Sequence, residues 1–324
     1  MLVTQSIKRP LVVLTGPTAV GKTKLSIALA KAIGGEILSA DSMQVYKHMD
    51  IGSAKIRPEE MQGVPHHLID ILEPWEEFNV VVFQKRCLKC MEQVYDRGHI
   101  PILVGGTGFY IQAVLRGIDF TENEENTEYR QKLEHLASEQ GPEVLHEMLA
   151  MVDPVSAQNI HVNNIKRTIR ALEYYELTGE PISTHNEREK KRTSPYNFSY
   201  FVLTDDREKL YDRIEARIDK MMSEGLVEEV RNLKKMGCHR GMISMQGLGY
   251  KEILDYLDQE CSLEEAVYTL KRDTRHFAKR QLTWFRRENE VIWLDKHQFD
   301  YDEEKILEYM LKELGEKGIY EKQQ

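Results

Sequence analysis

The stretch at residues 11–23, Leu-Val-Val-Leu-Thr-Gly-Pro-Thr-Ala-Val-Gly-Lys-Thr, decides the fold class. Its first five residues form a short apolar run rich in branched side chains, which predicts a buried strand. Residues 16–23 match the phosphate-binding loop pattern G-x-x-x-x-G-K-[ST] in full. The apolar spacing over 22–33 predicts a helix that stops at Gly34-Gly35. A strand, a glycine-rich loop and a helix in this order indicate a di- or triphosphate site.

Each part of the predicted loop has a physical purpose. Its glycines allow backbone N–H groups to face phosphate oxygens, and the helix N-terminus adds positive potential. We expect Lys22 to reach the outer phosphate and Thr23 to place its hydroxyl on Mg²⁺. The loop comprises Gly16, Pro17, Thr18, Ala19, Val20, Gly21, Lys22 and Thr23.

Strands and helices alternate further along the chain. A helix is expected over about 80–97, and strands over 36–40, 100–104, 199–203 and 291–294. This alternation predicts an α/β fold of the P-loop NTPase type, with a doubly wound, mostly parallel sheet. Between about 119 and 196 only helical spacing occurs. We therefore expect a core of residues 1–118 and 197–324, with C-terminal helices, and an inserted all-helical domain at 119–196.

Composition limits the class of protein. The chain has 324 residues, of which 41% are hydrophobic and 30% charged, enough for a sizeable core. No window has the ~18 uncharged apolar residues of a membrane span, and residues 1–10 lack the pattern of a signal peptide. Four cysteines are too few for a disulfide framework. These features predict a cytoplasmic protein that does not act at a membrane.

The charge distribution favours a polyanionic partner although the net charge is −9. Residues 271–287 hold seven basic side chains and one acid, and Lys166, Arg167 and Arg170 form another basic group. Binding to a polyanion depends on the local field. Ordinary solvated helix faces are an equally good interpretation of these clusters from charge alone. The aromatic residues within the first cluster could stack on bases or belong to the core.

Two further strand ends carry polar side chains. Asp41 follows the strand at 36–40, and Gly105-Gly106-Thr107 follows the strand at 100–104, where a P-loop ATPase usually has a metal-binding Asp. In an open α/β sheet, ligands bind outside the carboxyl ends of the strands. From its position alone, Asp41 could equally be a metal ligand, a general base or a helix cap.

Several segments together resemble one family, the tRNA dimethylallyltransferases or tRNA isopentenyltransferases. They occur in the family's order, from residue 11 to about 295, and no zinc-finger pattern follows Trp293, as in the bacterial type. Besides the loop, they are ADSMQVY at 40–46, DIGSAK at 50–55, VPHHLID at 64–70, GGTGFY at 105–110, RALE at 170–173 with LTG at 177–179, MQGLGYKE at 245–252 and KRQLTWFR at 279–286.

The resemblance implies a reaction. A dimethylallyl group moves from dimethylallyl diphosphate to N6 of the adenosine 3′-adjacent to the anticodon in tRNAs reading U-starting codons, and diphosphate leaves with the help of Mg²⁺. The loop would then hold a leaving group, which accounts for the missing ATPase-type Asp. An adenine amine is a weak nucleophile, so Asp41 would act as general base and Thr107 would orient the amine. Lys22, Thr23 and the loop amides would stabilise the diphosphate.

The resemblance also implies further contacts. Arg217 would touch the diphosphate, although a surface arginine paired with Glu215 or Asp219 is the alternative. The anticodon stem-loop of tRNA would contact Asp41, Ser42, Met43, Gln44, Thr107, Arg130, Lys166, Arg167, Thr168, Ile169, Arg170, Gln246, Gly247, Lys279 and Arg280. We expect a monomer.

Other functions compete with this one. A P-loop small-molecule kinase would need neither the insertion nor the basic helices. An adenylate isopentenyltransferase acting on free nucleotides would share the loop and Asp41, but it too leaves the basic clusters unexplained. Cys87-x-x-Cys90 has no second pair at zinc spacing, so buried structural cysteines are expected. His66-His67 is assigned by family likeness to a structural or substrate-channel role.

Overall fold

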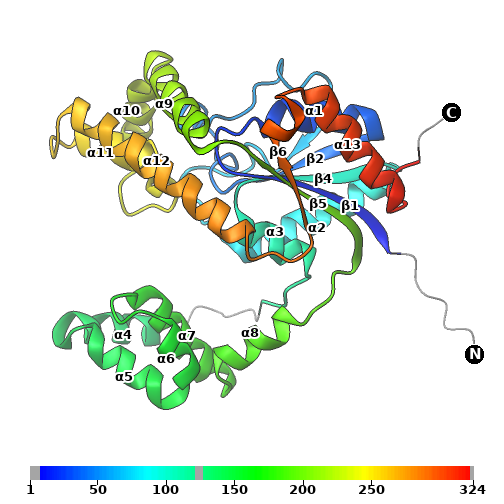
Figure 1. Ribbon diagram of the computed structural model, residues 1–324. Helices are drawn as coiled ribbons and strands as arrows, with labels where there is room; N and C mark the ends of the chain where they lie inside the picture. The colour runs from blue at the N-terminus through cyan, green and yellow to red at the C-terminus, as the bar shows by residue number, and fades with distance from the viewer. Residues whose placement is uncertain (1–7, 121–126, 322–324) are drawn as a thin grey trace, which may run out of the picture. The chain divides into compact units, whose positions relative to one another are not determined.

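The computed structural model describes residues 8–120 and 127–321, except for the side chain of Thr127. The chain divides into two compact units, one formed by Met1–Leu115 with Pro195–Gln324 and the other by Arg116–Ser194. The second unit lies within a few residues of the insertion expected at 119–196. Figure 1 shows the helices of this unit in green.

A six-stranded parallel sheet forms the centre of the first unit, in the order β3-β2-β4-β1-β5-β6. This arrangement confirms the predicted doubly wound α/β fold (Figure 1). The two-residue strand β3 was not expected, because two residues show no periodicity. The strands are β1 Arg9–Thr15, β2 Gly35–Ala40, β3 His66–His67, β4 Ile100–Gly105, β5 Tyr196–Thr204 and β6 Val291–Asp295.

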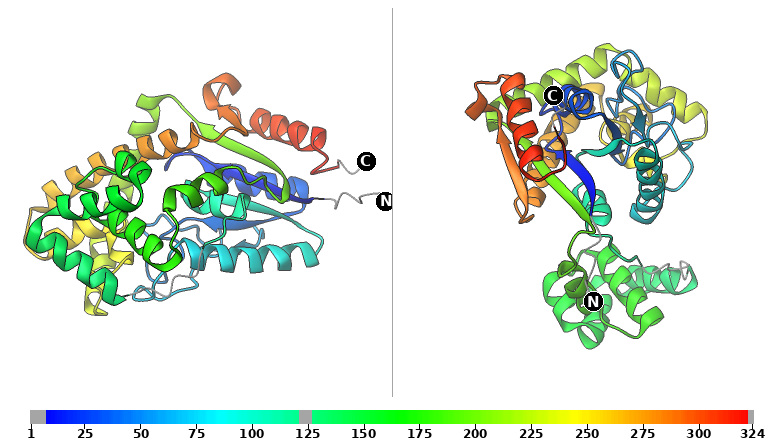
Figure 2. Two further views of the ribbon diagram at one scale, coloured as in Figure 1. Left: turned by 90° about the horizontal axis from the view of Figure 1, so that it is seen from below. Right: turned by 90° about the vertical axis from the view of Figure 1, so that its right-hand side faces the viewer.

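Helices cover both faces of this sheet. The chain moves from β1 to β2 in one direction along the sheet and from β2 to β4 in the other, so right-handed crossovers place their helices on opposite faces. One face carries α1 (Lys22–Ile33) and α13 (Glu303–Glu316), while α2 (Val80–Asp96) and α3 (Gly108–Leu115) pack on the other (Figure 2). Strand β2 is consequently buried at every residue.

The first unit also has a helical group between β5 and β6. It consists of α9 (Arg207–Ser223), α10 (Leu226–Lys235), the 3₁₀ turn η1 (Ser244–Gln246), α11 (Tyr250–Leu257) and α12 (Leu263–Phe285); η2 (Lys296–Phe299) follows β6. A capping box starts α12, because Ser262 accepts the Glu265 N–H and the Glu265 carboxylate accepts the Ser262 N–H. None of the described helices combines the length and apolar character of a membrane span.

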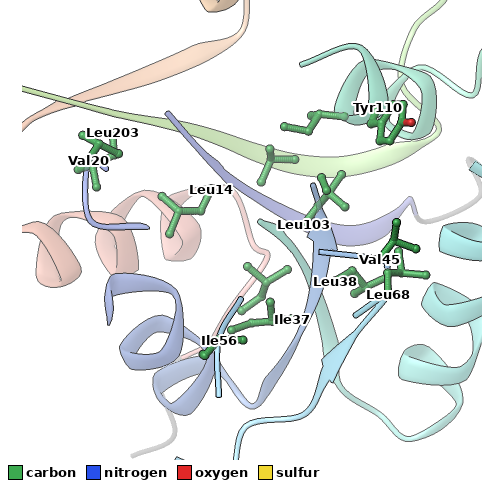
Figure 3. Close-up of a cluster of buried hydrophobic side chains, with 14 of the residues drawn as sticks. Leu14, Val20, Ile37, Leu38, Val45, Ile56, Leu68, Leu103, Tyr110 and Leu203 are labelled. Atoms are coloured by element: carbon green, nitrogen blue, oxygen red, sulfur yellow. The ribbon is translucent and has the colours of Figure 1, made fainter. Parts of the chain in front are cut away.

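Apolar side chains from both layers form the core of the first unit. Figure 3 shows Leu14, Leu38 and Leu103 from three neighbouring strands, with Val20 of the phosphate loop beside Leu203 of β5. All five are at most 1% exposed. The loop is therefore anchored in the core through Val20, while its polar atoms lie at the sheet edge.

The second unit is all helical in its described part. Its helices are α4 (Thr127–Gln140), α5 (Pro142–Val152), α6 (Pro154–Asn159), α7 (Ile165–Thr178) and α8 (Ile182–Lys190). It has a core of its own, which includes Leu133, Leu145 and Leu172. Residues 121–126 of the expected insertion lie outside the described residues. Periodicity over 133–177 correctly indicated α4, α5 and α7, but the short α6 and the polar α8 were not expected.

Candidate functional site

Three strand ends meet at one edge of the sheet. Thr15 of β1 and Ala40 of β2 both stand opposite Gly105 of β4, so the three strands end at the same level. The residues that follow these ends are therefore neighbours, as the sequence predicted for the phosphate loop, Asp41 and Thr107. The Thr107 N–H donates to the Ala40 carbonyl at 3.3 Å, which ties two of the turns together.

The phosphate loop has the backbone conformation that its glycines allow. Gly16 has φ 146°, and a Cβ there would lie 2.3 Å from the Leu203 carbonyl oxygen. Gly21, with φ 100°, is the N-cap of α1, where a left-handed conformation favours glycine. The Lys22 Nζ donates to the carbonyls of Gly16 and Pro17 at 2.9 and 2.8 Å. The lysine is thus folded back over the loop.

Charges from three elements meet at this loop. Burial and, to a smaller extent, the positive charge of Arg217 lower the pKa of Lys22 to about 7, and Asp41 opposes both effects. Burial also lowers the pKa of Arg217, again against the influence of Asp41. The Arg217 Nη1 lies 3.4 Å from the Thr18 hydroxyl. The loop therefore brings two cations near a single carboxylate, an arrangement whose charge suits a multiply charged anion.

Arg217 is directed into this site and is not a surface arginine paired with its helix neighbours. The two acids proposed as its alternative partners are engaged elsewhere. Glu215 forms an ion pair with Arg275, and Asp219 forms one with Lys271.

The two oxygens of Asp41 have different surroundings. Oδ1 accepts the N–H groups of Met43 and Gln44 at 2.8 and 3.4 Å, which closes the turn after β2. Among the described residues, no hydrogen bond reaches Oδ2. The capping role considered from the sequence is therefore filled by one oxygen alone. The other oxygen is free to accept a proton or to face a metal.

Two cavities border Asp41. One, of about 430 Å³, is lined by Asp41 and Thr107 and has apolar walls from α9 and α12, with Ile214, Ile218 and Phe277 among them. The other, of about 790 Å³, contains the loop. Both cavities share Thr18, Ala19, Asp41, Ser53, Arg217, Met221, Phe277 and Gln281. Asp41 thus borders both the cavity that contains the loop and the cavity with apolar walls.

Most of the predicted RNA-binding residues of the first unit gather around the smaller cavity. Ser42, Met43, Gln246, Gly247 and Arg280 line it, and Gln44 lines the larger one. A side chain at Gly247 would approach the Met43 Cε to 2.6 Å, so glycine allows these two segments to touch. Lys279 is exposed on α12 and lines neither cavity.

The other predicted RNA-binding residues belong to the second unit. Arg130 makes a two-point ion pair with the buried Glu173, at 2.9 and 2.8 Å. In the first turns of α7, Lys166 and Arg167 are exposed, while Thr168 and Ile169 are buried in the unit's core. Arg170 is half-buried. Within this group, Lys166 and Arg167 are thus the exposed side chains, and Thr168 and Ile169 belong to the core.

Sequence reasoning did not foresee how the DIGSAK segment is held. The Glu229 carboxylate of α10 accepts the N–H groups of Asp50, Ile51 and Gly52 at 2.9, 2.7 and 3.1 Å. The buried Tyr250 hydroxyl donates to Glu229 and accepts the Ser53 N–H. Glu229 resembled an ordinary helix-surface acid, because its partners lie about 180 residues away in the chain.

Among residues 8–120 and 127–321 there is no group of three acidic, histidine or cysteine side chains that could hold a metal. Cys87 is buried and Cys90 half-buried, and both are free thiols. His67 contacts Glu36, and His66 lines the larger cavity. Thr23 lines the larger cavity at the start of α1, a position that suits Mg²⁺ held mainly by phosphate oxygens and water.

The fold and the site define an α/β protein of the P-loop NTPase-like class, in which two cavities meet beside the loop. Comparisons with known proteins agree. Residues 44–288 match the family model described as IPP transferase, and residues 10–71 match the isopentenyl transferase model. The chain therefore belongs to the IPP transferase family, whose curated members among its relatives are tRNA dimethylallyltransferases.

Three relatives illustrate the likeness. A tRNA dimethylallyltransferase from Lachnoclostridium phytofermentans is 63% identical over 96% of this chain and 99% of its own length. The crystal structure of a full-length tRNA isopentenylpyrophosphate transferase from Bacillus halodurans matches with TM-score 0.72 at 46% identity, over 96% and 98% of the two chains. A eukaryotic dimethylallyltransferase acting on tRNA matches with TM-score 0.78 at 31% identity, over 89% of this chain and 74% of that one.

Proposed function

We propose that this enzyme transfers a dimethylallyl group from dimethylallyl diphosphate to N6 of the adenosine 3′-adjacent to the anticodon, in tRNAs that read U-starting codons. Diphosphate is the second product. The proposal rests on the position of Asp41, which borders both the cavity of the phosphate loop and the apolar cavity beside it. It also rests on the family, whose curated relatives are named tRNA dimethylallyltransferases.

The donor's diphosphate occupies the loop in this proposal. Loop N–H groups, Lys22 and Arg217 meet the charge that accumulates on the departing oxygen as the C–O bond breaks. Thr23, together with phosphate oxygens, would hold Mg²⁺, which would supply Lewis-acid stabilisation of that charge. Because these groups are positioned before the reaction starts, they stabilise the transition state without reorganising.

The acceptor enters the smaller cavity. The adenine N6 forms a bond to the prenyl carbon, and its proton passes to Asp41 Oδ2, the oxygen that accepts no hydrogen bond from the described residues. Thr107, which lines the same cavity, orients the amine. The apolar side chains of α9 and α12 keep water away from the electrophilic carbon. In the complete reaction one C–N bond forms, one C–O bond breaks and one proton moves from the amine to Asp41, so atoms and charge balance.

The acceptor base must leave its stack in the anticodon loop to reach this cavity. The exposed cations Lys279 and Arg280 on α12, and Lys166 and Arg167 on α7, supply contacts for the RNA backbone. One chain supplies the whole constellation, so we propose a monomer. With tRNA as the proposed acceptor, we propose that the enzyme acts in the cytoplasm.

A label-transfer assay tests the proposal. The protein is incubated with radiolabelled dimethylallyl diphosphate and Mg²⁺, together with unmodified tRNA or AMP; a parallel reaction contains ATP and small alcohols. We expect label in tRNA alone. Label in AMP would favour an adenylate isopentenyltransferase, and phosphate transfer from ATP would favour a small-molecule kinase.

A further inference from the structure

Gln281 occupies an unusual position between the two halves of the site. It lies on α12, is 6% exposed, and borders both cavities. The residues before it, Lys279 and Arg280, are exposed on the same helix. A buried amide next to two exposed cations therefore joins the basic helix to the interior of the site.

Both polar atoms of the Gln281 side chain are engaged by backbone groups from different strand ends. Its Oε1 accepts the Thr18 N–H of the phosphate loop at 2.9 Å. Its Nε2 donates to the Gly106 carbonyl, in the turn that leads to Thr107, also at 2.9 Å. The fit is tight, because a Cβ on Gly106 would lie 2.2 Å from Nε2.

These two bonds determine how two functional segments face each other. The Thr18 N–H points at the helix, which fixes the orientation of its peptide plane and the path of the loop beyond it. The Gly106 carbonyl is fixed at the same time, one residue before Thr107. A single side chain therefore sets the spacing between the diphosphate cradle and the residue that would orient the acceptor amine.

We propose that Gln281 is a positioning residue that holds the diphosphate loop and the Thr107 turn in register. The part of this inference that concerns prenyl transfer rests on the proposed function. The effect of Gln281 on the phosphate loop does not depend on the reaction. Losing both bonds should loosen the loop, which weakens diphosphate binding. It should also let Thr107 move, which slows the chemical step once both substrates are bound.

The test compares wild-type protein with Gln281→Met, which keeps the side-chain length and removes both bonds. Gln84→Met is the matched control, since the Gln84 amide on α2 also donates to a backbone carbonyl, that of Ala113, away from the cavities. Inorganic diphosphate affinity is measured by calorimetry. We expect a roughly tenfold loss in Gln281→Met and none in Gln84→Met, in line with the loss of one or two hydrogen bonds.

Kinetics give the second measurement. For Gln281→Met we expect a higher donor KM together with a kcat that is lower by roughly tenfold, at an unchanged tRNA dissociation constant. A merely structural role would lower the melting temperature and leave the folded fraction with wild-type diphosphate affinity, and that result overturns the proposal. Should Gln281→Met not fold, Gln281→Asn, which is one methylene too short to span both partners, serves in its place. Absence of prenyl transfer by the wild-type protein would instead refute the proposed function. The calorimetric comparison would still test the role of Gln281, because diphosphate binding is measured without the transfer reaction.

Discussion

Asp41 and Lys22 line the same cavity, although they follow two strands that are not neighbours in the sheet. Asp41 follows β2, and Lys22 belongs to the loop after β1; β4 lies between these strands and pairs with both. The carboxylate is close enough to raise the pKa of Lys22 against the effect of burial. In the proposed reaction, this relationship brings the proton acceptor and the groups that hold the diphosphate to one cavity.

The first prediction concerns pH. With a pKa of about 7, Lys22 is charged in the free protein below pH 7 and largely neutral above it. A bound diphosphate favours the charged form, so binding above pH 7 requires proton uptake, and affinity should fall by up to about tenfold per pH unit. Calorimetry with inorganic diphosphate at pH 8, in two buffers of different ionisation enthalpy, measures this uptake. The same measurement on Lys22→Met gives the proton uptake that comes from the ligand's own ionisation. Equal proton uptake by both proteins would contradict the assignment of the proton to Lys22.

A second prediction concerns RNA binding by α12. Replacing both Lys279 and Arg280 by Gln should weaken tRNA binding and reduce the slope of log K against log salt by about 1 to 2, because each phosphate contact contributes just under one unit. Filter binding over a range of salt concentrations measures the slope. The matched control is the exposed pair Lys85 and Arg86 on α2, replaced in the same way. Equal slopes for the two double variants would show that Lys279 and Arg280 are ordinary surface residues that do not contact tRNA.

The third prediction concerns stability at low pH. The buried Glu36 accepts two hydrogen bonds from Arg97 and contacts His67 and His99, and the pKa of Glu36 falls to about 2, chiefly through Arg97. A depressed carboxylate pKa stabilises the fold above the unfolded value of 4.5, and that contribution disappears as pH falls toward 2. It amounts to about 3 kcal/mol.

Urea denaturation of wild-type protein and Glu36→Gln tests this effect. The variant should be less stable at pH 7, and the difference should shrink steadily between pH 4.5 and pH 2. A difference of the same size at both ends of that range would show that Glu36 stabilises the fold by packing and not by charge.

Local signals made much of the fold predictable. The loop at 16–23 specified its own strand and helix, and α1 begins and ends at the expected residues because Gly21 and Gly34 adopt left-handed conformations at its two ends. Strand β3 escaped prediction, since its two residues are extended only through pairing with β2.

The candidate site was predictable where a residue follows a strand directly, as Asp41 and Thr107 do. Gln281 was not predictable in this way, because its two partners lie 263 and 175 residues away in the chain. The same holds for Glu229, whose amide partners come together only after α10 has packed. The spacing of residues in a motif predicts contacts within one turn or one helix. Gln281 and Glu229 instead connect turns and helices that are far apart in the sequence.

The central claim is that Asp41 takes the proton from the adenine amine while the loop holds the leaving diphosphate. Asp41→Asn keeps an oxygen for the Met43 and Gln44 N–H groups but cannot accept that proton. The most direct measurement is the single-turnover rate of label transfer to tRNA, with donor and tRNA both saturating. We predict a loss of roughly 10²–10⁴-fold in that rate, with diphosphate and tRNA affinities within about threefold of wild type. A variant that transfers the prenyl group at the wild-type rate would contradict the account.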